Sequence, residues 1–219
     1  MQKEIVPLET INNNLAPEKQ AFILYNVFTE EECKQLIEIG EQLGYKVRDP
    51  SSVHSNNYHK RAFYSSTTWA KYLYDRISPY LPSLEITEKK EGEEKQEIVT
   101  KYIPHSCDSL LRILRYNSGE HFPLHVDGTN YLGSEEQEEN KKEIRSFFTA
   151  QIYLNEEYEG GQTTFWEEEL PKTNNRRSIS LTSKTGMVLI FWQDYLHSGK
   201  EVTKGTKYTI RTDIFYQST

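Results

Sequence analysis

Residues 116–127, with the sequence Y-N-S-G-E-H-F-P-L-H-V-D, decide how the rest of the chain is interpreted. This stretch places His125 and Asp127 two residues apart just after a turn. In an extended strand the side chains alternate between two faces, so both residues share one face and only Val126 points away. The sequence therefore predicts a strand that presents an imidazole and a carboxylate side by side.

A second histidine would complete a metal site with this pair. The candidate is His197, which follows Asp127 by seventy residues in the segment L-I-F-W-Q-D-Y-L-H-S-G. Two histidines and one carboxylate make up the facial triad, which leaves open positions on Fe(II) for oxygen chemistry. An isolated H-x-D motif is also common among surface and core polar groups, and the same ligand types bind zinc. The wider sequence context has to decide.

Composition favours one domain with an aromatic core. The chain has 219 residues, a length that an all-β barrel with helical support can use completely. Only 36% of the residues are hydrophobic, but 15 Tyr, nine Phe and three Trp supply bulky side chains for a core. The net charge of −7 and the pI of about 5.5 argue against a nucleic-acid partner, which requires a basic face.

Cysteine usage and the N-terminal sequence bear on the cellular compartment. Cys33 and Cys107 are too few for a disulfide framework, which favours a reducing compartment. The first ten residues lack the apolar segment of a signal peptide, and no apolar run approaches the length of a membrane span. We therefore expect a cytoplasmic protein without a membrane partner.

The N-terminal half indicates two helices. Thr29 and Glu32 have the spacing of a capping box, which predicts a helix that stops at Gly44. Thr67 or Thr68 is expected to cap a second helix that runs to about Ser78. The remaining segments of this half are expected to be an irregular lead-in at 1–20, a strand at 21–28, and loops at 48–66 and 85–101.

The C-terminal half is dominated by short β-rich segments. A further polar loop is expected at 134–143. The spacing of these segments predicts an antiparallel sandwich or barrel. The expected strands are 110–116, 145–154, 163–166, 179–182, 187–192 and 207–216.

The last of these strands has two different faces. The better core face is expected to receive the N-terminal helices, and it carries Tyr208, Ile210, Thr212, Ile214 and Tyr216. The opposite face would lie in water if the strand were isolated. Inside a barrel it would form a polar lining suited to a doubly charged small ligand. That face carries Lys207, Thr209, Arg211, Asp213 and Phe215.

In this order, the segments resemble the Fe(II)- and 2-oxoglutarate-dependent dioxygenase superfamily, and within it the prolyl 4-hydroxylase-like branch. The H-x-D stretch follows a strand and a Tyr-x-x-Gly turn, as in that family. The next match is I-Y-L-N-E-E-Y-E-G-G-Q-T-T-F, and the last is F-W-Q-D-Y-L-H-S-G-K-E-V-T-K-G-T-K-Y. The early F-T-E-E-E-C-K-Q-L-I resembles the opening helix of the branch, so the resemblance covers most of residues 21–217.

The resemblance implies a mainly β fold with supporting helices, in which a double-stranded β-helix, or jelly-roll barrel, is braced by helices on one sheet. Residues 21–219 would form a single domain, with helical support in 21–108 and the jelly-roll core in 109–217. The implied metal ligands are His125, Asp127 and His197. A basic residue on the last core strand would bind the distal carboxylate of 2-oxoglutarate.

Lys207 matches this basic position best, because it follows the distal histidine by ten residues and precedes an aromatic residue. Arg211 lies on the same expected face and is the alternative, since a guanidinium fork suits a carboxylate. Tyr116 and Tyr153 match positions whose hydroxyls often face the co-substrate in relatives. Their other interpretation is that of ordinary barrel aromatics.

The implied reaction uses Fe(II), 2-oxoglutarate and O2, with ascorbate as a further candidate cofactor, and releases succinate and CO2. The expected substrate is a prolyl residue in a peptide or protein, and the enzyme would be a monomer or homodimer. Alternatives are another residue, a free amino acid or a small metabolite, or a jelly-roll binding module without activity. The loops at 48–66 and 128–143 are candidates for a substrate lid. The other histidines are interpreted as surface or turn residues: His54, His59, His105 and His121.

Overall fold

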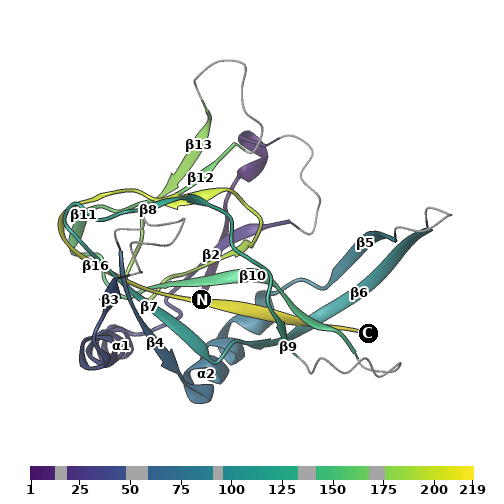
Figure 1. Ribbon diagram of the computed structural model, residues 1–219, viewed down its shortest axis with the longest axis horizontal. Coiled ribbons are helices and arrows are strands. Elements are labelled where there is room, and N and C mark those ends of the chain that lie inside the picture. The colour runs from purple at the N-terminus through teal and green to yellow at the C-terminus, as the bar shows by residue number, and fades with distance from the viewer. Residues whose placement is uncertain (13–18, 48–58, 91–95, 133–141, 168–175) are drawn as a thin grey trace.

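The computed structural model describes residues 1–12, 19–47, 59–90, 96–132, 142–167 and 176–219 (Figure 1). Within these residues, two antiparallel sheets build the body of the protein. The smaller sheet has four strands, in the order β13 (Ser178–Leu181), β12 (Thr163–Trp166), β15 (His197–Gly199) and β8 (Phe122–His125).

The larger sheet has a continuous path of eight strands and four further strands beside it. The path runs β1 (Gln2–Ile5), β2 (Ala21–Tyr25), β14 (Val188–Trp192), β10 (Ile144–Tyr153), β16 (Val202–Ser218), β7 (Leu110–Asn117), β4 (Lys60–Ser65) and β3 (Lys46–Val47). The further strands are β5 (Leu84–Lys90), β6 (Gln96–Cys107), β9 (Tyr131–Leu132) and β11 (Tyr158–Gly160).

The chain passes back and forth between the two sheets. Strands β7, β10, β14 and β16 lie in the larger sheet, whereas β8, β12, β13 and β15 lie in the smaller one. This alternation winds the chain into a double-stranded β-helix, which confirms the predicted jelly roll. The two metal-ligand candidates on strands, His125 and His197, both come from the smaller sheet.

Both predicted helices are present. In α1 (Glu30–Leu43) Thr29 accepts a hydrogen bond from the Glu32 main chain, and the Glu32 side chain accepts one from Thr29, so the capping box is complete. Helix α2 (Thr67–Ile77) is capped by Ser66, one residue before the predicted cap. Two short 3-10 helices lie at Leu8–Thr10 and Ser78–Tyr80.

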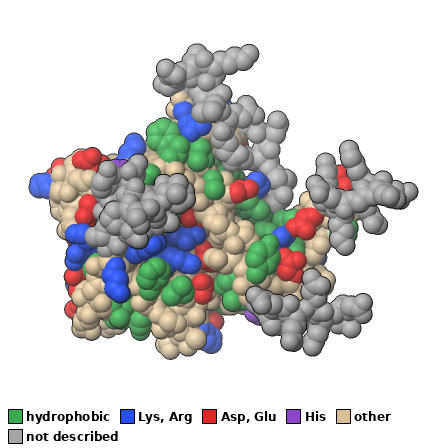
Figure 2. All heavy atoms as spheres, viewed as in Figure 1, with side chains coloured by type: hydrophobic (Ala, Val, Ile, Leu, Met, Phe, Trp, Pro, Cys, Tyr) green, Lys and Arg blue, Asp and Glu red, His purple; other side chains and the backbone are tan. Residues whose placement is uncertain are grey.

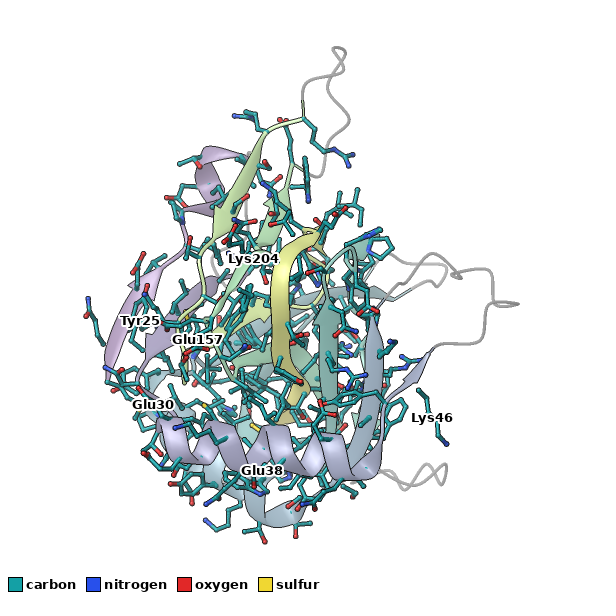
Figure 3. The ribbon with its side chains drawn as sticks, turned by 90° about the vertical axis from the view of Figure 1, so that its left-hand side faces the viewer. Tyr25, Glu30, Glu38, Lys46, Glu157 and Lys204 are labelled. Atoms are coloured by element: carbon teal, nitrogen blue, oxygen red, sulfur yellow. The ribbon has the colours of Figure 1, made fainter. Side chains whose placement is uncertain are left out.

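Helix α1 lies against the outer face of the larger sheet. Its buried stripe includes Cys33 and Leu36, while Glu30 and Glu38 are exposed along its outer side (Figure 3). Gly40 sits against the Ile113 side chain and the Tyr45 hydroxyl, and an added Cβ would collide with that hydroxyl. The glycine therefore allows the helix to lie close to the sheet.

Strand β16 is buried on both faces, which explains its mixed sequence. The face predicted to receive the helices carries Ile210 and Ile214, both fully buried, and Tyr208, whose hydroxyl donates to Glu41 of α1. On the opposite face, Lys207 and Asp213 are also buried. The polar face therefore lines the barrel rather than facing water.

Several polar segments are more ordered than the sequence predicted. Within the predicted loop at 85–101, residues 85–90 and 96–101 belong to the paired strands β5 and β6, which project from the body (Figure 1). Part of the predicted irregular lead-in forms β1, and part of the predicted loop at 48–66 forms β4. The predictions for 48–58 and 133–141, including His54 and most of the lid candidates, lie outside the described residues. No helix in the described part of the chain is long and apolar enough to cross a membrane.

Candidate active site

The two histidines of the candidate metal site face each other across neighbouring strands. His125 ends β8 and His197 begins β15, and the antiparallel register pairs these two residues directly. Their ring centroids are 4.2 Å apart. The carboxylate of Asp127 completes the group, and ligand atoms of the three side chains all lie within 4.8 Å of one another. Residues seventy positions apart in sequence thus converge on one point.

Each imidazole is oriented by a hydrogen bond to the main chain. Nδ1 of His125 lies 2.8 Å from the carbonyl oxygen of Pro123, and Nδ1 of His197 lies 2.8 Å from that of Tyr195. Because a carbonyl oxygen can only accept a hydrogen bond, Nδ1 of each ring carries the proton. The lone pair of Nε2 is therefore available to bind a metal. The Nε2 atoms of His125 and His197 lie 3.6 Å and 3.9 Å from the Asp127 oxygens. This donor set fits a divalent metal ion.

The protonation states of these groups also suit a metal. Burial lowers the pKa of His197 to about 4, although the nearby Asp127 carboxylate acts in the opposite direction. Burial by itself would raise the pKa of Asp127, but the neighbouring His125 imidazole and the charge of Arg211 hold it well below its usual range. At neutral pH His197 is therefore uncharged and Asp127 is ionised, as metal ligands must be.

Lys207 lines the same cavity as His125 and His197, and it is more deeply buried than either histidine. It is 2% exposed, and its Nζ donates to the carbonyl oxygen of Gly161 at 2.6 Å. The cavity wall includes His125, His197 and Lys207. Burial lowers the pKa of Lys207 to about 7. The Gly160–Gly161 turn has positive φ at both residues, and a Cβ on Gly161 would press on the Lys207 side chain.

Three tyrosine rings surround the Lys207 ammonium group. Its Nζ lies 5.3 Å from the ring centroid of Tyr116, 5.4 Å from that of Tyr153 and 5.9 Å from that of Tyr158. The hydroxyl of Tyr153 is hydrogen bonded to Thr163 at 2.6 Å. The sequence singled out Tyr116 and Tyr153 but missed Tyr158. The aromatic faces favour a cation at this position.

Arg211 occupies a different position from Lys207. It lines the same cavity, but its Nε donates to Oδ2 of Asp127 at 3.1 Å. Thr149 donates to the same oxygen at 2.6 Å. The guanidinium therefore contacts a candidate metal ligand, whereas Lys207 does not. The contact of Thr149 with Asp127 was not predicted from the sequence.

The surroundings of His125 include a histidine that was predicted to be at the surface. His59 is 1% exposed and its ring stacks on Phe122 at a centroid distance of 4.3 Å. Phe122 in turn stacks on His125 at 4.0 Å. The surface prediction for His59 was therefore wrong, because the aromatic stack removes it from water. His105 is exposed as predicted, although it lies on strand β6 rather than in a loop.

A groove adjoins the metal-ligand cavity on the side of the smaller sheet. It has a volume of about 480 Å3 and shares Phe122, Ser198 and Gly199 with the cavity wall. Leu124, which is 44% exposed, and Trp166 give it an apolar surface.

Figure 2 shows Lys and Arg side chains gathered between the strands labelled β8 and β7 in Figure 1, although the whole chain is acidic.

Residues 111–213 match the 2OG-Fe(II) oxygenase superfamily. The chain is 25% identical over 215 residues to the probable prolyl 4-hydroxylase 3 of Arabidopsis thaliana, with 89% of this chain and 69% of the relative covered. It is 26% identical over 212 residues to the probable prolyl 4-hydroxylase 8 of the same organism, with 88% and 67% covered.

Solved structures share the fold. A prolyl hydroxylase from Trichoplax adhaerens, in complex with a hypoxia inducible factor peptide fragment, superposes with a TM-score of 0.55 at 17% identity, covering 89% of this chain and 83% of that one. A prolyl-4-hydroxylase from Pseudomonas putida superposes with a TM-score of 0.53 at 11% identity, covering 94% and 97%.

The sequence match over residues 111–213 and the jelly roll agree, and they identify a dioxygenase that resembles the 2OG-Fe(II) oxygenase superfamily. The relatives to which it is similar are prolyl 4-hydroxylases. This class implies Fe(II) as the metal cofactor and 2-oxoglutarate and O2 as co-substrates. The binding module without activity, which the sequence left open, is thereby set aside.

Proposed function

We propose that the protein hydroxylates a prolyl residue of a peptide or protein and releases succinate and CO2. The observation that carries the proposal is the shared cavity of His125, His197 and Lys207, with Asp127 beside the two imidazoles. One end of this cavity offers a facial triad, and the other offers a single buried cation. That combination suits a metal and a dicarboxylate that lie next to each other.

In this proposal His125, Asp127 and His197 hold Fe(II), which when bound supplies the activation of O2 for attack on a C–H bond. The carbonyl oxygens of Pro123 and Tyr195 keep the imidazoles turned toward the metal. Lys207 binds the distal carboxylate of 2-oxoglutarate, and the tyrosine rings around it exclude water, which strengthens this ion pair. Ascorbate is proposed as a supporting reductant.

The groove beside the cavity supports a peptide-sized substrate. The groove has a volume of about 480 Å3 and an apolar surface at Leu124 and Trp166, which suits a short segment of an extended chain. Through Phe122, Ser198 and Gly199 it continues into the wall of the cavity that the ligand histidines line. A prolyl side chain could therefore approach the metal position while its flanking residues lie in the groove.

Intact-mass analysis of proline-containing peptides tests this function. Incubation with Fe(II), 2-oxoglutarate and O2 should add 16 Da to a peptide and form succinate in equal amount, since one oxygen atom enters each product. The His125→Ala variant serves as the blank. Fragment spectra that place the added oxygen on another residue would favour the alternative substrate, as would turnover of free amino acids but of no peptide.

A further inference from the structure

Arg211 bridges two carboxylates at the metal-ligand end of the cavity. Its Nε donates to Oδ2 of Asp127 at 3.1 Å, and its Nη2 donates to Oδ1 of Asp213 at 3.2 Å. The side chain of Asp213 is fully buried, and that of Arg211 is 18% exposed. A guanidinium can make both bonds at once because its donors form a rigid fork. The bond to Asp213 thus fixes the Arg211 guanidinium while its Nε contacts Asp127.

Asp213 is itself held by several hydrogen bonds. Its carboxylate accepts hydrogen bonds from Arg112 at 3.2 Å, from Asn130 at 2.7 Å and from Gln193 at 2.9 Å, in addition to the bond from Arg211. These donors come from β7, β16, the segment after Asp127 and the segment after β14. A buried carboxylate with this many donors is firmly oriented. It therefore provides a rigid support for Arg211.

The main chain of Asp127 is fixed by the same group of residues. Its N–H donates to the carbonyl oxygen of Gln193 at 2.8 Å, and the Gln193 side chain donates to Asp213. The segment after Asp127 is also tied down, because Asn130 exchanges hydrogen bonds with Ser146 and donates to Asp213. Both the backbone and the side chain of Asp127 are thus connected to the buried Asp213 carboxylate, the backbone through Gln193 and the side chain through Arg211.

The two oxygens of Asp127 have different surroundings. Oδ2 accepts from Thr149 at 2.6 Å and from Arg211 at 3.1 Å, so these two donors occupy it. Oδ1 lies 3.6 Å from Nε2 of His125, whereas Oδ2 lies 3.9 Å from Nε2 of His197. Because the donors on Oδ2 use its lone pairs, Oδ1 is the oxygen left to bind a metal through one bond. A single carboxylate bond keeps a further coordination position open for co-substrates.

We propose that Arg211, supported by Asp213, is the positioning residue that presents one oxygen of Asp127 to the metal. This assigns different tasks to the two cations of the barrel lining, since Lys207 serves the co-substrate and Arg211 serves the metal ligand. The assignment rests on the proposed metal site. It replaces the alternative in which Arg211 binds 2-oxoglutarate.

Metal affinity of purified variants tests the assignment without any turnover. The parent and Arg211→Gln are titrated with Co(II), whose absorption reports binding. We expect Arg211→Gln to bind the metal about 10- to 100-fold more weakly, the usual effect of losing a partner of a ligand. Arg115→Gln is the matched control, because Arg115 lies on the neighbouring strand β7 but bonds to Glu41 of α1, at 3.1 Å and 3.0 Å, rather than to Asp127 or Asp213. It should bind Co(II) nearly as the parent does.

A second measurement separates the two cations. With metal at saturation, 2-oxoglutarate affinity should fall strongly in Lys207→Ala and little in Arg211→Gln, whereas Co(II) affinity should show the opposite order. Arg211→Lys should lie between the parent and Arg211→Gln, since an ammonium group provides a charge without the fork. Thermal unfolding of the metal-free variants shows whether each one is folded, and Arg211→Lys takes the place of Arg211→Gln if the latter is not.

Two results would overturn the assignment. One is parent-like Co(II) binding by the Arg211 variants, and the other is equal weakening in Arg115→Gln, which would indicate general destabilisation. Failure of the proposed function looks different: the parent would bind metal and 2-oxoglutarate but hydroxylate no prolyl peptide, and the order of metal affinities among the variants would be unchanged.

Discussion

At the scale of the residue, His197 combines deep burial with an oriented ring. It is 5% exposed and bonded through Nδ1 to the Tyr195 carbonyl. We expect His197→Ala to abolish succinate formation, because two ligands hold the metal too weakly. The exposed His105 gives the matched control, and His105→Ala should keep parent activity. Succinate measurement with circular dichroism checks both; an active His197→Ala protein would contradict the ligand assignment.

Lys207 leads to a pH dependence of co-substrate binding. Its pKa, lowered by burial to about 7, lies below the ordinary value of 10.5, so the free protein loses this positive charge as the pH rises through about 7. Since 2-oxoglutarate needs the ammonium form, its KM should rise above that pH by up to about tenfold per unit. Lys207→Arg stays charged and should remove this dependence. A parent KM that is constant between about pH 6 and 9 would contradict the role.

The same burial has the opposite consequence for stability. Between about pH 7 and the ordinary lysine pKa, the unfolded chain binds a proton at Lys207 that the folded protein does not. The Lys207 contribution to the free energy of unfolding therefore increases with pH across this interval. Co-substrate binding and stability thus respond to pH in opposite directions at one residue.

At this scale the sequence predicted which residues would meet, but not every contact. The H-x-D spacing predicted that His125 and Asp127 would lie together, although β8 ends at His125 and Asp127 lies beyond this strand. The alternation in β16 placed Lys207 and Arg211 on one face. Whether Arg211 would reach a co-substrate or a metal ligand depends on the distance between strands that are far apart in sequence. That distance is a property of the closed barrel.

At the scale of the element, the capping box of α1 is a local feature with a measurable contribution. We expect Thr29→Ala to lower the free energy of unfolding by about 1 kcal/mol, because a main-chain N–H loses its acceptor. Urea unfolding measures the change. Glu38→Gln, at an exposed mid-helix position, should have a much smaller effect. Equal effects of the two changes would mean that the cap makes no special contribution.

The elements that the sequence predicted are those with a clear apolar period. The stripe of α1 and the apolar runs of β10 and β14 are of this kind. The β5–β6 hairpin was missed because its strands carry many charges and project from the body, so little of their surface needs to be apolar. An alternation was nevertheless present at the start of β5, where Leu84 is buried, Glu85 is exposed and Ile86 is half-buried.

At the scale of the whole molecule, the candidate metal site joins the two sheets. His125 and His197 belong to the smaller sheet, whereas Thr149 and Arg211 on the larger sheet hold the third ligand. Metal binding should therefore stabilise the folded protein. At a free metal concentration of 100 times the Kd, the gain is about 2.7 kcal/mol. Thermal unfolding with and without Mn(II) measures it, and His197→Ala should show no shift. A metal-independent Tm in the parent would count against the site.

The position of the triad between the two layers has a consequence for the cell. When iron is scarce, the protein lacks the metal–ligand bonds that connect the two sheets of the barrel. Its unfolded fraction then increases. Proteases degrade that fraction continuously. The abundance of this enzyme, and not only its turnover, would then follow the supply of iron.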